Sequence, residues 1–590
     1  MRALLSLFVS AACALGSLVL ASRSFAQPTF TDRAASVLGV VDLNARSASL
    51  ADIEGDGDLD LFFQLATGSQ RLYRNNLIGS GTLTFTNISS MLPAGLGASW
   101  SAAWGDYDGD GRLDVFVGQS NTSVGAAGDL LRNNWPAAFT NVSVATGLDD
   151  PGFHQNVAWN DIDNDRDLDL LIGMEGPDPT DEKHEIYLQG PAGSFTPVGA
   201  AVGFQAPEGI KAYGMAIGDT DGDGDLDIYV STCRFGNNIR NNFYQNLLVE
   251  TGSLAFVDIA DSNGTQNTRN SYGAEFHDFD DDGDLDLFMV GADQQPSKLF
   301  RNNGGNLFTD IDTITGHPLL TSTGSDFGGG RAVDYENDGD LDLFFHDHLA
   351  TVGNHARKLF RNDGNWQFTD VTTLAGIAAT NQAAYDSAWG DIDHDGDQDL
   401  IAPTGNTFAE RVFISNASGN GNHWLYVRLK GPSDNTTGIG ATLYATLDEG
   451  TLQERTMRRE ANTNAGTFNQ SDLPVHFGLG SVDQIDQLRV LWPDGSSQGL
   501  FNISANQYIT VAYNPGDYNG NGIVNAADYV VWRKGLGTIY TQADYNVWRS
   551  RFGQSAGSGS GGNTTVPEPA SAWLLLALAA VFVAPARKRV

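Results

Sequence analysis

The sequence predicts an all-β protein: a seven-bladed β-propeller with calcium loops, then a small β-sandwich-like domain and a small α-helical module. Two observations predict the propeller. An acidic nonapeptide returns seven times in the 590 residues, at intervals of 54 to 59 residues, and such a period is typical of repeat architectures. Each period also holds four strand-like segments, the number in one propeller blade, and closing the blades into a ring protects their edges.

The four segments of a period follow one another in a fixed order. The strand entering the acidic loop is rich in small and aromatic residues, as in SAAWGD at 101–106. The loop is followed by an apolar run such as LDLFFQL at 59–65, whose content of aromatic residues indicates a buried strand. A third segment resembles KLFRNN at 298–303, and a fourth resembles FTD at 308–310. Because an FTD string at 30–32 precedes the first loop, we expect an N-terminal strand to close the ring against C-terminal strands.

Each nonapeptide has the composition of a calcium site. Acidic side chains recur at positions 1, 3, 5 and 9, and a backbone carbonyl is available at position 7, which together supply the hard oxygen ligands that Ca²⁺ prefers. Position 6 is glycine in six copies because the chain must turn sharply there. The exception is Arg166, so we expect the third loop to bind most weakly. Solvated acidic turns are the alternative, but so many carboxylates in nine residues repel one another without a counter-ion.

The candidate calcium ligands comprise about seven propeller sites. They are Asp52, Glu54, Asp56, Asp58 and Asp60; Asp106, Asp108, Asp110, Arg112 and Asp114; Asp161, Asp163, Asp165, Asp167 and Asp169; Asp219, Asp221, Asp223, Asp225 and Asp227; Asp278, Asp280, Asp282, Asp284 and Asp286; Asp334, Glu336, Asp338, Asp340 and Asp342; and Asp391, Asp393, Asp395, Asp397 and Asp399. About half of the chain's 72 acidic residues lie in these loops, against 34 Lys and Arg in all. The formal charge of −38 argues against nucleic acid and anionic membrane surfaces as partners.

Two further modules follow the predicted propeller at 27–418. Residues 419–513 alternate apolar strands with Gly and Pro-Asp-Gly turns, which favours a small β-sandwich. Residues 514–554 contain a 12-residue EF-hand-type loop and two similar helical strings, ADYVVWRKGLG and ADYNVWRSRFG. The candidate ligands of this one further calcium site are Asp517, Asn519, Asn521, the Ile523 carbonyl, Asn525 and Asp528. A plain helical hairpin with an Asn-Gly turn is the alternative.

Both ends of the chain have the form of targeting segments. Residues 1–26 are typical of a cleaved secretory signal, which leaves Cys233 as the single cysteine of the mature chain. A Gly/Ser-rich linker at 555–565 leads to a tail at 566–590 with a Pro-Glu-Pro string, a short apolar run and a basic end. An ordinary C-terminal anchor is the alternative to a processed sorting tail.

These strings carry four family resemblances. Residues 28–418 resemble the FG-GAP/VCBS repeat family, whose integrin α-subunit members are seven-bladed propellers with D-x-D-x-D-G-x-x-D calcium loops. The following strings resemble the ASPIC/UnbV domain of the cartilage acidic protein family, which implies no defined chemistry; its usual Ser-Gln pair is Asn469-Gln470 here. The matching positions are Asn422, Trp424, Leu425, Gly438, Gly440, Ala441, His476, Phe477, Gly478, Leu479, Gly480, Trp492, Pro493, Asp494 and Gly495.

The other two resemblances concern the C-terminal part. The duplicated loop-helix resembles a dockerin with one complete loop, which implies a cohesin-like partner. The tail resembles a PEP-CTERM sorting signal, which implies an exosortase-type processing enzyme in a bacterium and a membrane contact through the tail only.

The motifs indicate an exported, calcium-stiffened protein of the bacterial cell surface or extracellular space. We expect a non-enzymatic adhesion, matrix or interaction module whose partner is an extracellular protein or polysaccharide. The alternative is a polysaccharide-active enzyme or its carbohydrate-binding subunit, although no nucleophile elbow, P-loop or HExxH string occurs. His346, His348 and His355 are the best candidates for a transition-metal site, but surface histidines after a strand are commoner. His476 is expected to be a structural histidine.

Overall fold

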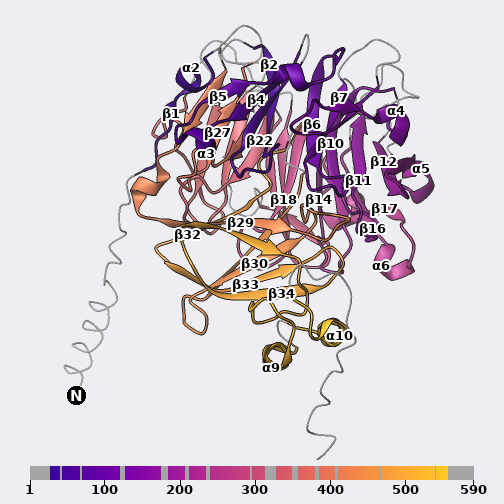
Figure 1. Cartoon of the computed structure of the whole chain (residues 1–590), viewed down its shortest axis with the longest axis vertical. Helices are drawn as coiled ribbons and strands as arrows, with labels where there is room; N and C mark the ends of the chain where they lie inside the picture. The colour runs from indigo at the N-terminus through magenta and orange to yellow at the C-terminus, as the bar shows by residue number, and fades with distance from the viewer. Residues whose placement is uncertain are drawn as a thin grey trace, which may run out of the picture.

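A computed structural model describes most of the chain between residues 27 and 555 (Figure 1). The described ranges are 27–39, 43–66, 70–119, 127–149, 151–174, 184–205, 211–233, 240–292, 295–311, 327–347, 357–378, 385–404, 410–463, 467–468, 470–537 and 540–555. The predicted signal segment and sorting tail lie outside these ranges. Among the described residues, no helix combines the length and the apolar composition needed to cross a membrane.

The N-terminal part is built from antiparallel four-stranded sheets. In the described residues there are seven of them. In order along the chain they are β2 (Ala45–Ala51), β3 (Asp60–Leu65), β4 (Arg71–Asn75) and β5 (Phe85–Asn87); β6 (Ser99–Gly105), β7 (Asp114–Gln119), β8 (Asp129–Arg132) and β9 (Thr140–Asn141); β10 (His154–Asn160), β11 (Asp169–Met174), β12 (His184–Gly190) and β13 (Ser194–Pro197); β14 (Lys211–Gly218), β15 (Asp227–Cys233), β16 (Asn242–Asn246) and β17 (Phe256–Asp258); β18 (Ser271–His277), β19 (Asp286–Gly291), β20 (Lys298–Asn302) and β21 (Phe308–Asp310); β22 (Phe327–Val333), β23 (Asp342–Asp347), β24 (Arg357–Asn362) and β25 (Phe368–Asp370); and β26 (Ala388–Gly390), β27 (Asp399–Ala402) and β28 (Arg411–Ile414) with β1 (Thr31–Asp32).

Each acidic loop connects the first and second strands of its sheet, as the sequence predicts. Short helical turns mostly follow the third or fourth strand of a sheet. They are α2 (Ala34–Val37), α3 (Leu77–Ser80), η1 (Ser89–Met91), α4 (Ser143–Thr146), α5 (Gly199–Val202), α6 (Leu248–Thr251), α7 (Ala260–Asn263) and η2 (Ala417–Asn420).

The two ends of the repeat region meet in one sheet. β1 pairs antiparallel with β28, with Thr31 opposite Ile414 and Asp32 opposite Phe413. The expectation that an N-terminal strand closes the ring is therefore confirmed. Since a ring closed in this way needs both ends of the region, removal of either end would leave a sheet edge unpaired.

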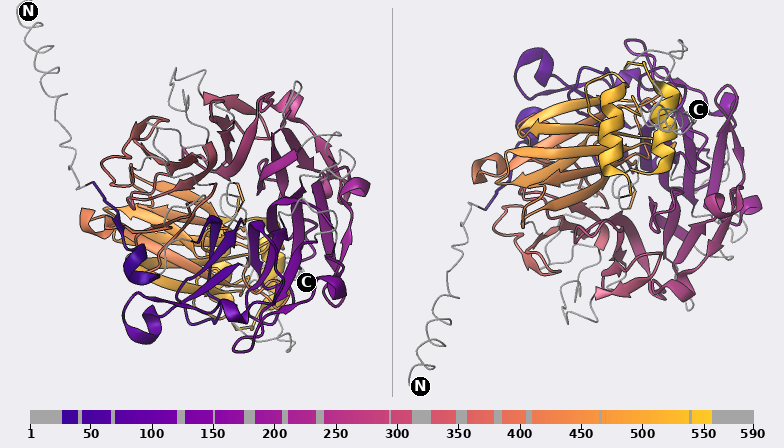
Figure 2. Two further views of the ribbon diagram at one scale, coloured as in Figure 1. Left: turned by 90° about the horizontal axis from the view of Figure 1, so that it is seen from above. Right: turned by 90° about the horizontal axis from the view of Figure 1, so that it is seen from below.

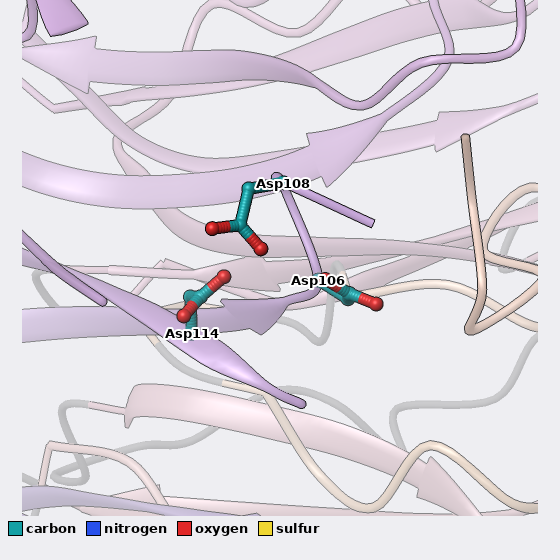
Figure 3. A group of neighbouring side chains, drawn as sticks. All are labelled: Asp106, Asp108 and Asp114. Atoms are coloured by element: carbon teal, nitrogen blue, oxygen red, sulfur yellow. The ribbon is translucent and has the colours of Figure 1, made fainter. Parts of the chain in front are cut away.

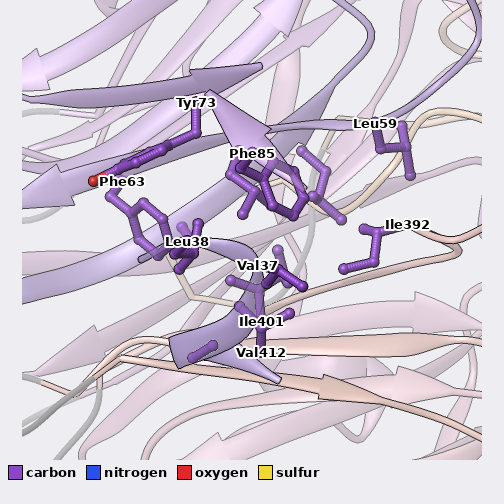
Figure 4. Packing of buried hydrophobic residues seen from close by; sticks show 14 of the residues in the cluster. Val37, Leu38, Leu59, Phe63, Tyr73, Phe85, Ile392, Ile401 and Val412 are labelled. Carbon is purple, nitrogen blue, oxygen red and sulfur yellow. The ribbon is translucent and has the colours of Figure 1, made fainter. Parts of the chain in front are cut away.

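The hydrophobic core is distributed between neighbouring sheets. One cluster joins the sheet containing β2 to β5 with β26, β27, β28 and α2, through residues such as Phe63, Ile401 and Val412 (Figure 4). Six more clusters join successive sheets in the same way. The all-β class and its repeated four-stranded sheets are confirmed. The total of seven blades stays a prediction, which the cyclic order of these clusters supports.

The second domain is a sandwich of two sheets. One sheet has the order β32 (Val475–Gly480), β29 (His423–Lys430) and β35 (Gln507–Ala512), and β29 and β35 are parallel. The other has the order β31 (Arg455–Glu460), β30 (Thr442–Leu447), β33 (Gln484–Leu491) and β34 (Ser497–Ser504). Side chains of both sheets form one core. The sandwich lies against the face of the ring to which the acidic loops belong (Figures 1 and 2).

The helical module is packed beneath the sandwich (Figure 1). It consists of α9 (Ala526–Gly535) and α10 (Gln542–Arg551), and both helices begin with a capping box. The indole of Trp532 donates to the Thr541 carbonyl at 2.8 Å, and that of Trp548 donates to the Asn525 carbonyl at 2.8 Å. Each tryptophan thus binds the residue that caps the opposite helix, as expected for two copies of one unit.

Candidate metal centres in the acidic loops

The aspartate at position 1 closes each loop. Its carboxylate accepts a hydrogen bond from the backbone amide of position 6 in all seven loops, at 2.7 to 3.1 Å. In six loops it also accepts one from the amide of position 5, at 3.0 to 3.2 Å. Because these amides lie within a turn that offers no backbone acceptor, the carboxylate substitutes for one.

The aspartate at position 9 ties the loop to its own sheet. One of its oxygens accepts the amide of a residue at the end of the third strand in every loop, at 2.7 to 2.9 Å. In five loops the other oxygen accepts the amide of position 2, at 3.0 to 3.1 Å. Positions 1 and 9 therefore have structural roles as well as the predicted metal-binding role.

The backbone is left-handed at positions 4 and 6 of every loop. Position 6 has φ between 87° and 107° in all seven copies, including Arg166 at 88°. The sharp turn expected there is confirmed, and only glycine adopts it without steric cost. Position 4 has φ between 56° and 78° and is occupied by Gly, Asn, Asp or His, the residues that tolerate this conformation best.

The third loop departs from the common geometry. The amide of Asp165 donates to Asp163 at 3.3 Å, and Asp161 Oδ1 is buried without a hydrogen-bond partner. The Arg166 guanidinium instead points to the sandwich, 3.4 Å from the Asp494 carboxylate. This loop therefore keeps the turn at position 6, but the Asp161 carboxylate accepts fewer backbone hydrogen bonds than the position 1 carboxylates of the other loops.

The remaining carboxylate oxygens converge. In the second loop, single oxygens of Asp106, Asp108 and Asp114 lie within 4.8 Å of one another, and Asp108 and Asp114 turn their carboxylates toward each other (Figure 3). Comparable groups occur in the third, fourth and fifth loops. Eight buried carboxylate oxygens in the described loops have no hydrogen-bond partner. They belong to Glu54, Asp58, Asp114, Asp161, Asp167, Asp223, Asp280 and Asp393.

This donor set fits Ca²⁺. Buried, unpartnered carboxylate oxygens are costly, and a hard divalent cation takes six to eight such ligands. Burial, followed by repulsion from neighbouring carboxylates, raises the pKa of Asp114 and of Asp227 to about 8 and that of Asp161 to about 7. A bound cation would reverse these shifts because it favours the ionised form.

Position 7 contributes differently from the other acidic positions. The Asp58 side chain accepts the Ile78 amide at 2.9 Å, and Asp225 accepts the Val249 amide at 2.9 Å. These carboxylates thereby hold α3 and α6 against the loop. In the second loop the Arg112 side chain donates to the Asn133 carbonyl at 3.0 Å. One oxygen of each of these carboxylates is thus used in structure, whereas the other oxygen of Asp58 is buried without a hydrogen-bond partner. That position 7 offers its backbone carbonyl to an ion stays a prediction.

Two sets of residues near the loops were missed by the sequence analysis. Glu250 in α6 lies with Asp223 and Asp225, with single oxygens within 4.8 Å of one another. In the sequence, the only indication of Glu250 as a candidate ligand was that it lies one segment after the acidic loop. The other set is the asparagine at or just after the end of the third strand. Asn133 donates to the carbonyl of Leu113 in its own acidic loop at 3.1 Å, and to that of Ile53 in the preceding loop at 2.8 Å. The repeated RNN string was the available signal for this second set.

The 12-residue loop before α9 repeats the design at its first position. Asp517 accepts the amides of Asn521 and Gly522, at 3.1 and 2.7 Å. Asn525 caps α9 by accepting the Ala527 amide at 2.8 Å, a role that the sequence analysis did not assign to it. Its amide group also donates to the Ile523 carbonyl at 2.9 Å. The assignment of these residues as calcium ligands stays a prediction.

The histidines give no second site in the described residues. His346 is fully buried in β23, with its ring 4.8 Å from that of Phe344, and burial holds its pKa well below the usual value. His348 and His355, predicted as its partners, lie outside the described residues. His476 packs on Tyr426 with ring centroids 4.7 Å apart, as a structural histidine would.

Family profiles match much of the chain. Residues 52–117, 161–230, 278–345 and 346–402 match the FG-GAP-like repeat, and residues 431–517 match the ASPIC and UnbV domain. The chain therefore carries FG-GAP repeats and an ASPIC/UnbV domain, and both resemblances are confirmed. The dockerin and PEP-CTERM resemblances stay predictions.

Two relatives in sequence are animal proteins. The chain is 26% identical over 500 residues to cartilage acidic protein 1 of Xenopus tropicalis, covering 79% of this chain and 73% of that protein. It is 25% identical over 545 residues to cartilage acidic protein 1 of Mus musculus, covering 83% and 77%. Among solved structures it is similar to the Dos1 propeller, with 10% identity, a TM-score of 0.34, and coverage of 60% of this chain and 75% of that chain.

Proposed function

We propose that this protein is an exported, calcium-binding propeller protein that acts outside the cell as a non-enzymatic interaction module. One observation carries the calcium binding: buried carboxylate oxygens without hydrogen-bond partners recur in loops of one repeated geometry. FG-GAP repeats, the ASPIC/UnbV domain and the similarity to cartilage acidic protein 1 support an extracellular role. The bacterial surface, adhesion and a protein or polysaccharide partner are parts of this proposal.

Calcium would be held by the carboxylates at positions 1, 3, 5 and 9 and would neutralise their mutual repulsion. At ten times its dissociation constant, each ion bound only by the folded chain contributes about 1.4 kcal/mol, so seven independent sites would contribute roughly 10 kcal/mol. That amount is comparable to the whole net stability of a domain. Chelation with EDTA should therefore lower the melting temperature sharply, and Mg²⁺ should restore it poorly. An unchanged melting curve in EDTA would contradict the proposal.

A single-site variant tests the ligand assignment. Asp393 at position 3 of the seventh loop has one buried oxygen without a partner, so Asp393→Asn removes a charge with little change in shape. Calorimetric titration should show one calcium site fewer, or one site much weaker, than in the parent chain. Asp483→Asn changes an exposed carboxylate outside the loops and is the matched control. Equal stoichiometry and affinity in all three chains would contradict the assignment.

The interaction role has its own test. Binding to a glycan array, with and without EDTA, examines a polysaccharide partner, and capture of cohesin-like domains examines the helical module. Calcium-dependent binding of one glycan class, without change in that glycan, supports the non-enzymatic role. Cleavage of the bound glycan would instead favour the polysaccharide-active alternative.

A further inference from the structure

The sandwich contacts the acidic loops through basic side chains. Arg428 in β29 donates to the Gly57 carbonyl of the first loop. Arg458 and Arg459 in β31 are buried, with side chains that reach the fifth and sixth loops. The lower face of the ring is partly covered by the sandwich, as the right-hand view of Figure 2 shows, and the acidic loops on this face thus meet arginines of the sandwich. Buried guanidinium groups need such partners, because their desolvation is otherwise costly.

These contacts repeatedly use one atom of the loop. The carbonyl of position 6 accepts from Arg428 in the first loop, from Arg458 in the fifth at 2.9 Å, and from Arg459 in the sixth at 2.8 Å. The left-handed backbone at position 6 sets the direction of that carbonyl. The predicted ion uses the carbonyl of position 7 and carboxylates instead. The sandwich therefore recognises the shape of a closed loop. Side chains of the sandwich also donate to the position 1 carboxylates of two loops, Thr436 to Asp106 and Tyr508 to Asp391.

Two arginines bridge loops of neighbouring blades. Arg455 donates to Asp340 in the sixth loop at 2.6 Å and forms an ion pair with Asp281 in the fifth. Arg458 donates to the Gly283 carbonyl in the fifth loop and to the Asp219 carbonyl in the fourth, at 2.9 and 3.0 Å. Since one planar guanidinium must reach two loops, both loops must hold their closed positions at once.

The strand that carries these arginines leads directly into the centre of the ring. β31 ends at Glu460, and the described residues between 461 and 474 then contact first strands of several sheets. Thr463 accepts the Trp159 amide of β10, and Gln470 accepts the Trp104 amide of β6, each at 2.7 Å. The ring of Phe468 lies 5.4 Å from that of Trp100. We call residues 461–463, 467–468 and 470–474 the plug, because they lie between these first strands.

We infer that calcium in the acidic loops controls the docking of the sandwich and thereby the insertion of the plug into the propeller. The inference rests on the proposed calcium binding. Without cations, four to six acidic side chains in nine residues repel one another, which favours an open loop. A divalent ion leaves such a loop negative, so the arginines are still attracted while the position 6 carbonyls are held in place. The coupling is reciprocal: a docked sandwich raises calcium affinity by the same factor.

Hydrogen exchange measured by mass spectrometry on the full chain tests this inference. The amides of Trp104 and Trp159 report plug insertion, since both donate to plug side chains. With calcium they should be protected, and in EDTA they should exchange at least tenfold faster. Amides in the core of the sandwich, such as that of Val490, indicate whether that domain itself unfolds. Unchanged or slower exchange of the two tryptophan amides in EDTA would overturn the inference.

Substitution in the presence of calcium separates docking from metal removal. Arg458→Gln and Arg455→Gln should speed exchange of the Trp104 and Trp159 amides severalfold while calorimetry still finds the parent number of calcium sites. Arg549→Gln alters an exposed arginine of α10 and should change neither readout. If calorimetry detects no calcium binding by the parent chain, the proposed function and this inference both fail. If calcium binds and the exchange rates do not respond, only this inference fails.

Discussion

Arg166 is the one non-glycine residue at position 6 of the seven loops, and its replacement separates backbone strain from charge. A left-handed backbone costs a residue with a side chain about 1–2 kcal/mol, and Arg166 has φ of 88°. Arg166→Gly removes this strain, but roughly 0.5–1 kcal/mol of the gain in stability is lost because glycine makes the unfolded chain more flexible. Arg166→Ala keeps the strain but removes the charge and its ion pair, as Arg166→Gly also does, so it is the matched control.

The two variants should agree in affinity and differ in stability. At a separation of about 8 Å through water, a unit charge and a divalent ion repel by about 1 kcal/mol before screening, a factor of about five in affinity. Both variants should therefore bind calcium in the third loop more tightly than the parent chain. Only Arg166→Gly should also melt higher than Arg166→Ala, by about 1–3 °C. The ion pair with Asp494 contributes little to this difference, because the Arg166 side chain is 50% exposed and both variants lose it.

Calcium titration followed by hydrogen exchange of the peptide 161–169 measures the affinity of this loop. In the parent chain its midpoint should lie at the highest calcium concentration of the seven loops, and both variants should shift it lower. The reasoning is refuted if the third loop is protected first, or if neither variant moves the midpoint. Equal melting temperatures for the glycine and alanine variants would refute the strain argument alone.

Four further predictions concern the pH dependence, the turn at position 6, the asparagine after the third strand and the C-terminal tail. Burial raises the pKa of the position 9 carboxyls of Asp114 and Asp227 from 3.8 to about 8, so between those pH values they bind protons that the unfolded chain has lost. Without calcium, the free energy of unfolding should therefore fall as the pH rises through that range. Because calcium binds the ionised form, the difference in melting temperature between calcium and EDTA samples should widen from pH 5 to pH 8. Gly396→Ala should weaken docking and lower the melting temperature more than Gly224→Ala, because both have φ above 90° but only the first would bring a Cβ against the sandwich. Asn133→Ala removes the donor to the buried Ile53 carbonyl and the half-buried Leu113 carbonyl and should cost about 2 kcal/mol, against a smaller loss for Asn134→Ala in the adjoining, exposed turn. C-terminal mass spectrometry of released protein should find the tail after the Pro-Glu-Pro string removed, and an intact Val590 would contradict that processing.

The propeller could be predicted because its information is local and repeated. Alternation of apolar strands, the turn at position 6 and the FTD string at 30–32 each depend on a few neighbouring residues, and each recurs. Repetition also identifies which positions matter, since Arg166 is visible as an exception only beside six glycines. The closing strand β1 followed from the same logic, because a fourth-strand string stood before the first loop.

The docking surface could not be predicted because it depends on residues distant in the sequence. The string RTMRRE at 455–460 has the appearance of a polar edge strand, and nothing local indicates that Arg458 and Arg459 become buried. Likewise the plug resembles an ordinary polar loop with one phenylalanine. Its contacts with Trp104 and Trp159 exist only after the ring has closed and the sandwich has covered it.

The nonapeptide is uniform because nearly every position in it has a separate physical role. Positions 1 and 9 each use carboxylate oxygens on backbone amides, so asparagine there would leave an amide unsatisfied or bring an NH₂ group against it. Positions 4 and 6 require a left-handed backbone, and the carbonyl that position 6 thereby directs is the one that Arg458 and Arg459 bind. Position 3 has few such contacts and keeps unpartnered oxygens in Glu54, Asp280 and Asp393. A loop with a folding role alone would not need the unpartnered carboxylates of position 3. A loop with a metal-binding role alone would not need the directed carbonyl of position 6. The repeat therefore retains both features where one loop must hold an ion and also present a defined surface to the domain above it.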